Sequence, residues 1–254
     1  MTTSIVSLRG VGKTFGAGVV ALDGLDLGVR AGEFLSLLGP SGCGKSTALR
    51  IIAGLSAPSR GAVTWGDTGE HTIGFVFQEP TLMPWATVAG NVYLPLKLAG
   101  VGRAAAAPRI EDTLRRVGLS EFRDAYPRQL SGGMKMRVSI ARALVTQPRL
   151  LLMDEPFAAL DEITRFKLND DLLALWRELR MTVVFVTHSV FESVYLSQRV
   201  VVLTARPGRV SSELTIDAPS RDAQFRTSAA YVAHCRTASE ALARAMDARS
   251  GAAA

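Results

Sequence analysis

The residues best suited to chemistry form a glycine-rich loop, Gly39-Pro40-Ser41-Gly42-Cys43-Gly44-Lys45-Ser46-Thr47. The loop fits the pattern G-x-x-x-x-G-K-[ST], in which consecutive backbone N–H groups surround a polyphosphate. An apolar run at 34–38 precedes the loop and a helix-forming run at 48–53 follows it, so we expect a strand that turns directly into a helix. The positive end of the helix dipole would add to the N–H groups. The loop therefore predicts a polyphosphate site.

Two side chains of this loop have predicted roles toward the phosphates. Lys45 would reach the β and γ phosphates as a point charge, and the Ser46 hydroxyl would complete the coordination of a Mg²⁺ that bridges them. The alternative is an ordinary glycine-rich turn with a surface lysine. The strand before the loop and the helix after it argue against that alternative.

A pair of carboxylates, Asp154 and Glu155, follows the apolar run 150–153. A continuous apolar run of this length is typical of a strand buried in a parallel sheet. The carboxyl end of that strand should abut the phosphate loop, where Asp154 would hold the Mg²⁺ shell. Glu155 would then orient and deprotonate an attacking water. In the alternative interpretation the two acids cap the next segment.

Three side chains give weaker signals when each is taken alone. Gln78 ends the apolar strand 73–77, and its amide could face a metal ion or a water. His188 ends the predicted strand 182–187, on the side where parallel sheets bind ligands, so a contact to a γ-phosphate is reasonable. Phe15 lies on a glycine-flanked loop and would either stack on a nucleotide base or belong to the core.

A second glycine pair follows Leu130 in the stretch Ser131-Gly132-Gly133-Met134, which opens a helical pattern over 135–146. Ser131 is a natural N-cap. The glycines permit close approach of backbone to whatever the helix N-terminus faces, for which an anion is the obvious candidate. The alternative is a capped helix start with nothing bound.

Composition limits the class of protein. The 254 residues, 48% of them apolar, can bury a sizeable core at the upper end of one domain. The formal net charge of +6 suits an anionic ligand or a membrane face, but Lys and Arg are scattered as on a solvated surface. Charge alone leaves nucleic acid possible as a ligand. Two cysteines, no signal peptide and no uninterrupted apolar span predict a cytoplasmic protein.

The other patterns predict the elements that must position these residues. The segment 80–96 is rich in proline and lacks regular periodicity, so it is either a loop that covers the core or a docking surface. Short apolar runs separated by Gly and Asp indicate an antiparallel sheet before the phosphate loop. The expected strands are 5–8, 19–22, 25–29, 34–38, 61–65 and 73–77, with helices at 110–118 and 163–179, a hairpin of 200–203 with 209–214, a helix-prone stretch 217–246 and a frayed end at 250–254.

Together these motifs resemble the ATP-binding subunit of an ABC transporter over residues 5–215. The phosphate loop, Gln78, Leu130–Gly133, Leu150–Pro156, Asp161 and His188 occur in that family's order and at compatible spacings. The resemblance implies an α/β P-loop NTPase of ABC ATPase type, with a mainly parallel core sheet flanked by helices and an antiparallel β subdomain. The segment that follows Gln78, called the Q-loop, and a helical subdomain would together span about 80–145. This part would carry the signature motif, Leu130–Gly133, and 216–254 would form a helical extension.

The same resemblance implies ATP and Mg²⁺ as cofactors and a role for each motif residue. ATP would bind to Phe15 through its base and to residues 39–47 through its phosphates, with Ser46, Gln78 and Asp154 at the metal. Glu155 would be the general base, and His188 would be the switch histidine. Gln78 would be the glutamine that senses the metal and the water. The γ-phosphate of ATP bound to a second copy of the chain would be contacted by Ser131, Gly132, Gly133 and Met134. Asp161 would couple the two copies. The two chains would close head to tail.

Sequence around the signature resembles importers. Tyr126-Pro-Arg-Gln leads directly into it, and 77–85 followed by 91–96 is similar to the nitrate, sulfonate and taurine group. This implies transmembrane permease partners that dock on 80–96 and a solute-binding protein reached through the complex. It also implies a peripheral location on the inner face of the cell membrane and no nucleic-acid partner.

Two other functions are considered. A soluble ABC ATPase that acts on ribosomes or nucleic acid usually has two fused cassettes or a coiled-coil insertion, and neither is found in this sequence. A nucleotide-binding regulator that does not hydrolyse ATP would have no need of Glu155. The transported solute stays open among sulfonates, nitrate, taurine and pyrimidine precursors, because such a subunit never touches its cargo.

Overall fold

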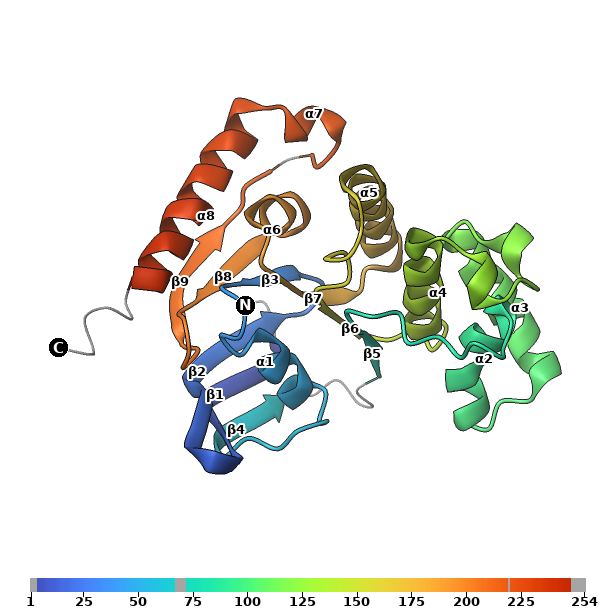
Figure 1. Ribbon diagram of the computed structural model, residues 1–254, viewed down its shortest axis with the longest axis horizontal. Helices are drawn as coiled ribbons and strands as arrows, with labels where there is room; N and C mark the ends of the chain where they lie inside the picture. Colours follow the sequence, from blue (N-terminus) through green and yellow to red (C-terminus); the bar gives the residue numbers. More distant parts are fainter. Residues whose placement is uncertain (1–3, 67–71, 219, 248–254) are drawn as a thin grey trace. The chain divides into compact units, whose positions relative to one another are not determined.

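The computed structural model describes residues 4–66, 72–218 and 220–247 (Figure 1). The chain divides into two compact units, one made of 1–69 with 182–254 and the other of 70–181. The predicted frayed end at 250–254 lies outside the described residues. Of the described helices, none combines the length and the apolar character needed to cross a membrane.

The first unit contains a three-stranded antiparallel sheet in the order β2-β1-β4. The predictions for its first strands are too short, since β1 runs from Ser4 to Phe15 and β2 from Val19 to Arg30, while β4 is Arg60–Trp65. Asp23-Gly24 reads as a turn in the sequence, but β2 continues through it with Gly24 at φ 67°. A glycine in the left-handed region inside a strand is typical of a bulge, which bends the strand without ending it.

The same unit holds a buried, mainly parallel group of strands in the order β7-β3-β8-β9. β3 (Phe34–Leu38), β7 (Thr182–Thr187) and β8 (Arg199–Leu203) are buried at every residue, as their continuous apolar runs predict. β9 (Val210–Thr215) returns antiparallel to β8, which agrees with the predicted hairpin.

Helices cover these strands in the first unit. α1 (Lys45–Ile52) leaves the phosphate loop, and α6 (Val190–Leu196) follows β7. α7 (Ala223–Arg226) and the long α8 (Ala229–Asp247) form the end of the described chain. α8 packs on α6, β8 and β9 (Figure 1), so the helix-prone C-terminal stretch belongs to this unit.

The second unit pairs β5 (Ile73–Val76) with β6 (Leu150–Asp154) in parallel. Its helices are α2 (Val88–Leu98), α3 (Arg103–Arg116), α4 (Gly132–Leu144) and α5 (Glu162–Leu179). Short 3₁₀ turns, η1 (Gly16–Gly18) in the first unit and η2 (Ser120–Phe122) and η3 (Pro127–Gln129) in the second, complete the chain.

Two helices of the second unit differ from the prediction because each contains a proline. The segment 80–96 was expected to be irregular, but its residues from Val88 onward form α2, with Pro95 near the end of the helix. Thr87 caps α2, and its side chain accepts a hydrogen bond from Gly90 N. α3 begins at Arg103, earlier than the predicted 110, and passes through Pro108. Proline removes one backbone donor, and packing of α2 on α3 and α4 outweighs that loss.

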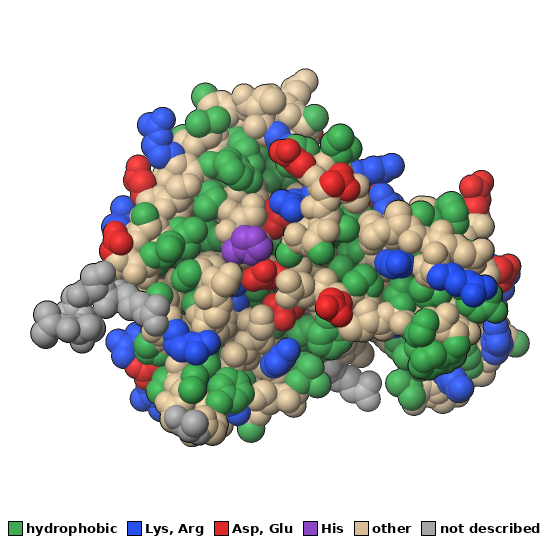
Figure 2. Space-filling view, in the orientation of Figure 1, with side chains coloured by type: hydrophobic (Ala, Val, Ile, Leu, Met, Phe, Trp, Pro, Cys, Tyr) green, Lys and Arg blue, Asp and Glu red, His purple; other side chains and the backbone are tan. Residues whose placement is uncertain are grey.

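The α/β class with a mainly parallel sheet and a separate antiparallel sheet is confirmed. On the face shown in Figure 2, Lys and Arg side chains are interspersed with Asp, Glu and apolar side chains. On that face, the basic side chains are not gathered into one patch.

Candidate functional site

The phosphate loop lies in the first unit, between buried β3 and the start of α1. Lys45 is almost fully buried, at 3% exposure, and its Nζ donates to the carbonyl oxygens of Gly39 at 2.8 Å and Pro40 at 2.9 Å. The loop thus folds around its own ammonium group. A fixed cation inside a ring of backbone groups at a helix start is suited to a polyphosphate.

Gly44 shows why the loop needs glycine at its junction with α1. It is the N-cap residue of α1 with φ 104°, a conformation that residues with a side chain rarely adopt. A Cβ at Gly44 would also lie 2.7 Å from the carbonyl oxygen of Ala21 and 2.7 Å from Leu22 Cδ2. β2 therefore packs directly against the loop, and a larger residue here would displace it.

His188 comes next to the phosphate loop through the pairing of β3 with β7. Leu38 pairs with Thr187 in the parallel register, so Gly39 and His188 leave neighbouring strands at the same edge. The Thr187 hydroxyl donates to buried Glu192 Oε2 at 2.6 Å and accepts from Ser189 N at 3.0 Å. These bonds fix the turn that presents the exposed His188 at this edge.

Phe15 ends β1 with 47% of its surface exposed, so the interpretation as a core residue is wrong. Lys13 Nζ lies 5.3 Å from the centre of its ring, and Phe15 pairs with exposed Val19 across the sheet. An exposed aromatic ring with a cation near it and an apolar neighbour is suited to stacking on a base.

The second unit brings Gln78 and the two carboxylates to one edge. Val76 pairs with Met153 in the parallel register of β5 and β6, so Gln78 and Asp154 follow adjacent strands. Asp154 is buried and ends β6, whereas Gln78 is exposed. The carboxyl ends of parallel strands are where such sheets bind ligands.

Glu155 has a strained backbone. Its φ is 44°, a left-handed conformation that is uncommon for a residue with a long side chain. Such strain costs on the order of 1–3 kcal/mol and concentrates at functional sites. The turn after it is closed by a bond from Ala158 N to the Glu155 carbonyl oxygen at 3.2 Å, which holds the half-buried carboxylate just beyond β6.

Residues 131–134, which we call the signature turn, start α4. Ser131 is exposed and is the N-cap, with its Oγ accepting a hydrogen bond from Met134 N at 3.3 Å, as predicted. A Cβ at Gly133 would lie 2.6 Å from Thr164 Cγ2. The close neighbour of this glycine is therefore α5, so Gly133 is explained by helix packing, while the exposed Ser131 and Gly132 remain accessible to a ligand.

Asp161 lies beside this turn because it caps α5. Its Oδ1 accepts a hydrogen bond from Thr164 N at 2.9 Å, and Thr164 is the residue that contacts Gly133. The hydrogen bond from the Thr164 backbone lowers the pKa of the Asp161 carboxyl. Asp161 is therefore ionised at neutral pH, on the exposed side of the two helix starts.

Two residues that hold the segment after Gln78 were missed by the sequence interpretation. Arg142 of α4 donates to the carbonyl oxygens of Thr81 and Pro80, each at 2.8 Å, and burial lowers the pKa of its guanidinium. Asn91 is fully buried and accepts from Met83 N at 2.7 Å while donating to the Ala86 carbonyl at 3.1 Å. The Arg142 bonds join positions 61 and 62 residues apart, and the Asn91 bonds depend on the conformation of the turn, so no local sequence signal reveals them.

The hydrogen bonds of Asn91 fix the turn that carries Trp85 at the surface. Asn91 also donates to the Met83 carbonyl at 3.2 Å and to the Thr87 carbonyl at 3.0 Å, which closes the turn on both sides of Trp85. The indole has 77% of its surface exposed. A rigid turn thus presents a large apolar side chain to solvent, which is typical of an interaction surface.

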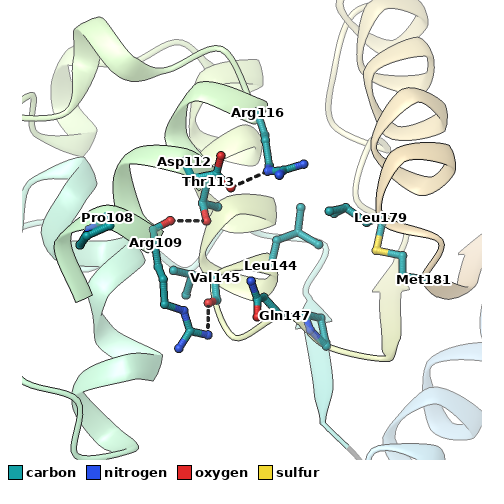
Figure 3. A pocket seen from close by; sticks show the side chains of 11 residues that line it. Pro108, Arg109, Asp112, Thr113, Arg116, Leu144, Val145, Gln147, Leu179 and Met181 are labelled. Atoms are coloured by element: carbon teal, nitrogen blue, oxygen red, sulfur yellow. Dashed lines mark hydrogen bonds and ion pairs between the residues drawn. The ribbon is translucent and has the colours of Figure 1, made fainter. Parts of the chain in front are cut away.

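A cavity of about 410 Å³ in the second unit contains none of the predicted residues (Figure 3). It lies between α3, the end of α4 and the end of α5, beside Met181. Its two arginines are already bonded, Arg109 to the Val145 carbonyl at 2.8 Å and Arg116 to Asp112 at 2.7 Å. None of the motif residues lines this cavity, so it is not the site that the motifs predict.

The donor set predicted for a metal consists of the Ser46 hydroxyl, the Gln78 amide and the Asp154 carboxylate. Hard oxygen donors with a single carboxylate suit Mg²⁺, which usually takes its other ligands from phosphates and water. Within the described ranges, no group of three or more His, Cys, Asp or Glu side chains could hold a metal ion. A Mg²⁺ that takes its ligands from these three residues and a nucleotide stays a prediction.

The predicted residues thus fall into two sets, each assembled within its own unit. The first unit joins residues 39–47 with His188 at one edge of its strands, and Phe15 lies at the end of β1 in the same unit. The second unit joins Gln78 with Asp154 and Glu155 at one edge. It also joins Ser131 with Asp161 at the starts of α4 and α5. The role of each residue stays a prediction.

Comparison with known proteins identifies the family. The sequence model of the ABC transporter family matches residues 22–158, more than half of the chain. The chain is 49% identical over 216 residues to the aliphatic sulfonates import ATP-binding protein SsuB 1 of Pseudomonas savastanoi pv. phaseolicola, covering 85% of this chain and 87% of that protein.

Solved structures agree with this assignment. CbiO1 from Clostridium perfringens, part of the ABC transporter complex CbiONQ, superposes with a TM-score of 0.75 at 28% identity, covering 84% of this chain and 88% of that one. An ATP-binding cassette, solved as a dimer in a post-hydrolysis state with ADP and Pi, gives a TM-score of 0.73 at 35% identity, covering 84% and 99%. From its motifs, its fold and these relatives, the chain belongs to the ABC transporter family as an ATP-binding subunit with ATPase activity.

Proposed function

We propose that this ATPase subunit drives the import of aliphatic sulfonates or closely related small organic anions. The observation that carries the proposal is the 49% identity to a protein named as an aliphatic sulfonates import ATP-binding protein, over 87% of that protein's length. Similarity of this extent covers both the nucleotide motifs and the segment expected to meet a permease. Nitrate, taurine and pyrimidine precursors are the competing solutes, and a role on ribosomes or nucleic acid is disfavoured by the same relative.

Growth tests the solute class. We expect a strain that lacks this gene to lose growth on alkanesulfonates as sole sulfur source, while growth on sulfate continues. The wild-type gene should restore growth and Lys45→Ala should not. Normal growth of the deletion strain on unsubstituted alkanesulfonates, together with a defect on nitrate or on taurine, which is an amino-substituted alkanesulfonate, would assign another solute.

The proposed mechanism of hydrolysis assigns a role to each motif residue. Residues 39–47 bind the phosphates of ATP through backbone N–H groups and Lys45, and Phe15 stacks on the base. Glu155 takes a proton from the attacking water, and His188 donates a hydrogen bond to the γ-phosphate.

Ser46, Gln78 and Asp154 would hold Mg²⁺. The ion, when bound, neutralises charge that develops on the phosphates. Gln78 also orients the water toward Glu155, because its amide can accept from the water while it faces the metal.

A second copy of the chain completes each site in this proposal. Ser131 and Gly132 are exposed at a helix N-terminus, which favours an anion. We expect Ser131–Met134 to meet the γ-phosphate of ATP held by a partner, with ionised Asp161 next to the contact. Head-to-tail closure over two ATP molecules follows, and a related cassette was solved as a dimer.

The proposed permease surface is the turn that presents Trp85. Its exposed indole and its fixing by Asn91 favour a partner that buries an aromatic anchor. CbiO1, similar in fold, is part of a transporter complex. Docking on a permease would place the subunit at the inner face of the cell membrane and would link it, through the complex, to a solute-binding protein.

The domain organisation is also a proposal. We infer an ATP-binding domain over 5–215, with the Q-loop and helical subdomain at about 80–145, and a C-terminal extension over 216–254. Helices α7 and α8 lie in this extension and pack with the first unit, so the extension is expected to support the nucleotide-binding part.

A further inference from the structure

The turn between β8 and β9 lies against the phosphate loop. This turn, residues 204–209, includes Arg206-Pro207-Gly208-Arg209, which the sequence interpretation treated as a simple hairpin connection. Arg206 Nε donates to the carbonyl oxygen of Gly42 at 3.2 Å. Both residues line a cavity of about 270 Å³ together with Pro40, Ser41, Ala205 and Met246. The turn and the loop therefore share a surface.

At Gly208, the backbone of the turn packs closely against the backbone of the phosphate loop. A Cβ at this position would lie 2.1 Å from the carbonyl oxygen of Cys43. Gly208 N donates to the Ala21 carbonyl at 2.9 Å, and the Gly208 carbonyl accepts from Asp23 N at 3.1 Å. The turn is thereby hydrogen-bonded to β2 on one side and packed on the phosphate loop on the other.

The turn is itself held rigid. The Thr204 hydroxyl donates to the Pro207 carbonyl at 2.9 Å and accepts from Arg209 N at 3.0 Å. Arg209 pairs with Asp23 of β2, with Nε 3.0 Å from Oδ2. Ala205 N donates to the carbonyl of Ala245 at 3.3 Å, which ties the turn to the last residues of α8.

We propose that residues 204–209 act as a brace that positions the phosphate loop, with Arg206 as a positioning residue for nucleotide binding. A trans peptide is planar, so a bond to the Gly42 carbonyl fixes the plane of the Gly42–Cys43 peptide and, with it, the direction of the adjacent N–H groups. A loop held in its binding conformation loses less conformational freedom when the ligand binds. The proposal rests on the proposed binding of ATP phosphates by residues 39–47.

Arg206 can be altered so that the hydrogen bond and the charge are separated. Arg206→Ala removes both, whereas Arg206→Gln places its amide nitrogen at the same position along the side chain as Nε and keeps a donor without the charge. Arg236→Ala is the control, because it removes an exposed arginine from α8. Gly208→Ala tests the backbone contact, and Gly102→Ala is its control, since a Cβ there would meet no described atom within 4 Å.

The measurements are the ATP and ADP affinities of the full chain by titration calorimetry, with steady-state KM and kcat for ATP. We expect Arg206→Ala to weaken both affinities about 3- to 10-fold, as the loss of one hydrogen bond predicts, and to raise KM while kcat changes less than about twofold. Arg206→Gln should recover most of the affinity. Gly208→Ala should lose more affinity than Arg206→Ala, and both controls should match the wild type.

The two proposals fail in different ways. If Lys45→Ala binds ATP as the wild type does, the phosphate-loop function fails. If Lys45→Ala loses binding while Arg206→Ala and folded Gly208→Ala bind normally, the brace is refuted and the function stands. An Arg206→Gln variant as weak as Arg206→Ala would also refute positioning by the hydrogen bond. Should circular dichroism show that Gly208→Ala is unfolded, the Arg206 variants decide.

Discussion

The phosphate loop and the signature turn are both glycine-rich helix starts, but their surroundings differ. The phosphate loop is packed by β2 at Gly44, contacted by the turn 204–209 at Gly42 and filled by its own buried Lys45. Ser131, in contrast, is exposed and bonded to its own helix at Met134 N. Contacts within its own unit preorganise the phosphate loop for binding a ligand. The exposed helix start at Ser131, in contrast, is suited to a group that belongs to another molecule.

The same contrast occurs within the segment that follows Gln78. Asn91 is fully buried and makes four hydrogen bonds to the turn 83–87, while Trp85 in that turn is mostly exposed. A docking surface needs two properties, which are a backbone fixed by buried hydrogen bonds and an apolar side chain exposed to solvent. The contrast can be tested from both sides, by altering the supporting residues and by altering the exposed ones.

The largest effect is expected for Glu155→Gln, which keeps the size of the side chain and removes the proposed base. General-base catalysis contributes roughly 10²–10⁴-fold, so turnover should fall by that factor while ATP still binds. Bound ATP then persists and stabilises a dimer by mass action. Size-exclusion chromatography with light scattering should find a dimer with ATP and a monomer without it.

The double variant Glu155→Gln with Ser131→Arg tests whether the signature turn acts across that dimer. A bulky cation would stand where the proposed hydroxyl contact to the γ-phosphate is needed, so the dimer should be lost with ATP affinity retained. Glu155→Gln with Arg128→Ala, an exposed position close in sequence, is the control that should still dimerise. A double variant at Ser131 that dimerises with ATP would remove the argument for a shared site.

Lys45→Ala tests the enclosed loop. Loss of an interaction with a charged group is worth about 1.5–3 kcal/mol, so we expect ATP affinity to fall about 10- to 100-fold and turnover to fall about 100-fold or more. The measurements are titration calorimetry and phosphate release, with exposed Lys97→Ala as the control. Unchanged turnover in Lys45→Ala would contradict the phosphate-loop interpretation.

Asn91→Ala tests the buried support of the Trp85 turn. The substitution leaves the Met83 N–H without its acceptor and removes three bonds to carbonyls, so we expect the free energy of unfolding to fall by roughly 2–3 kcal/mol. Denaturant melts measure it. Asn169→Ala is the control, because Asn169 is equally buried but its Oδ1 accepts no hydrogen bond from the described residues. Equal losses in both variants would mean that the bonds to the turn add little.

The smallest effect is expected for Trp85→Glu, which should leave ATP binding and stability of the isolated subunit unchanged. Loss of an aromatic anchor commonly costs more than 1 kcal/mol of binding, so affinity for the permease should fall at least about 5-fold. Co-purification with the permease measures this, with Leu98→Glu as a control of similar exposure, 79% against 77%. A Trp85→Glu variant that misfolds alone, or one that co-purifies normally, counts against the docking surface.

The sequence allowed the fold class and most elements around the site to be predicted, because the strands there are buried on both faces. Such strands read as continuous apolar runs, and β3, β6 and β7 agree with the predictions to within one residue. Strand β2 and helix α2 could not be predicted, since Asp23-Gly24 and Pro95 are local signals for a break. Sheet pairing and helix packing outweighed both signals.

The candidate residues were predictable from motifs, but the residues that support them were not. Arg142, Asn91 and Arg206 bond to backbone carbonyls that are distant in sequence or depend on a loop conformation. No side-chain pattern marks a carbonyl acceptor, because every residue has one. These supporting hydrogen bonds are therefore identified from the three-dimensional structure and not from the sequence.

The cavity that the end of α8 shares with the phosphate loop also offers a route to a fluorescent reporter. Met246 lines the cavity beside Pro40, Ser41 and Gly42 and has 51% of its surface exposed. Both native cysteines, Cys43 and Cys235, are buried, so thiol-reactive dyes would label a Met246→Cys variant selectively. A dye at this position would sense the environment of the loop directly, and nucleotide occupancy would be read as a change in light emission without a label on the nucleotide.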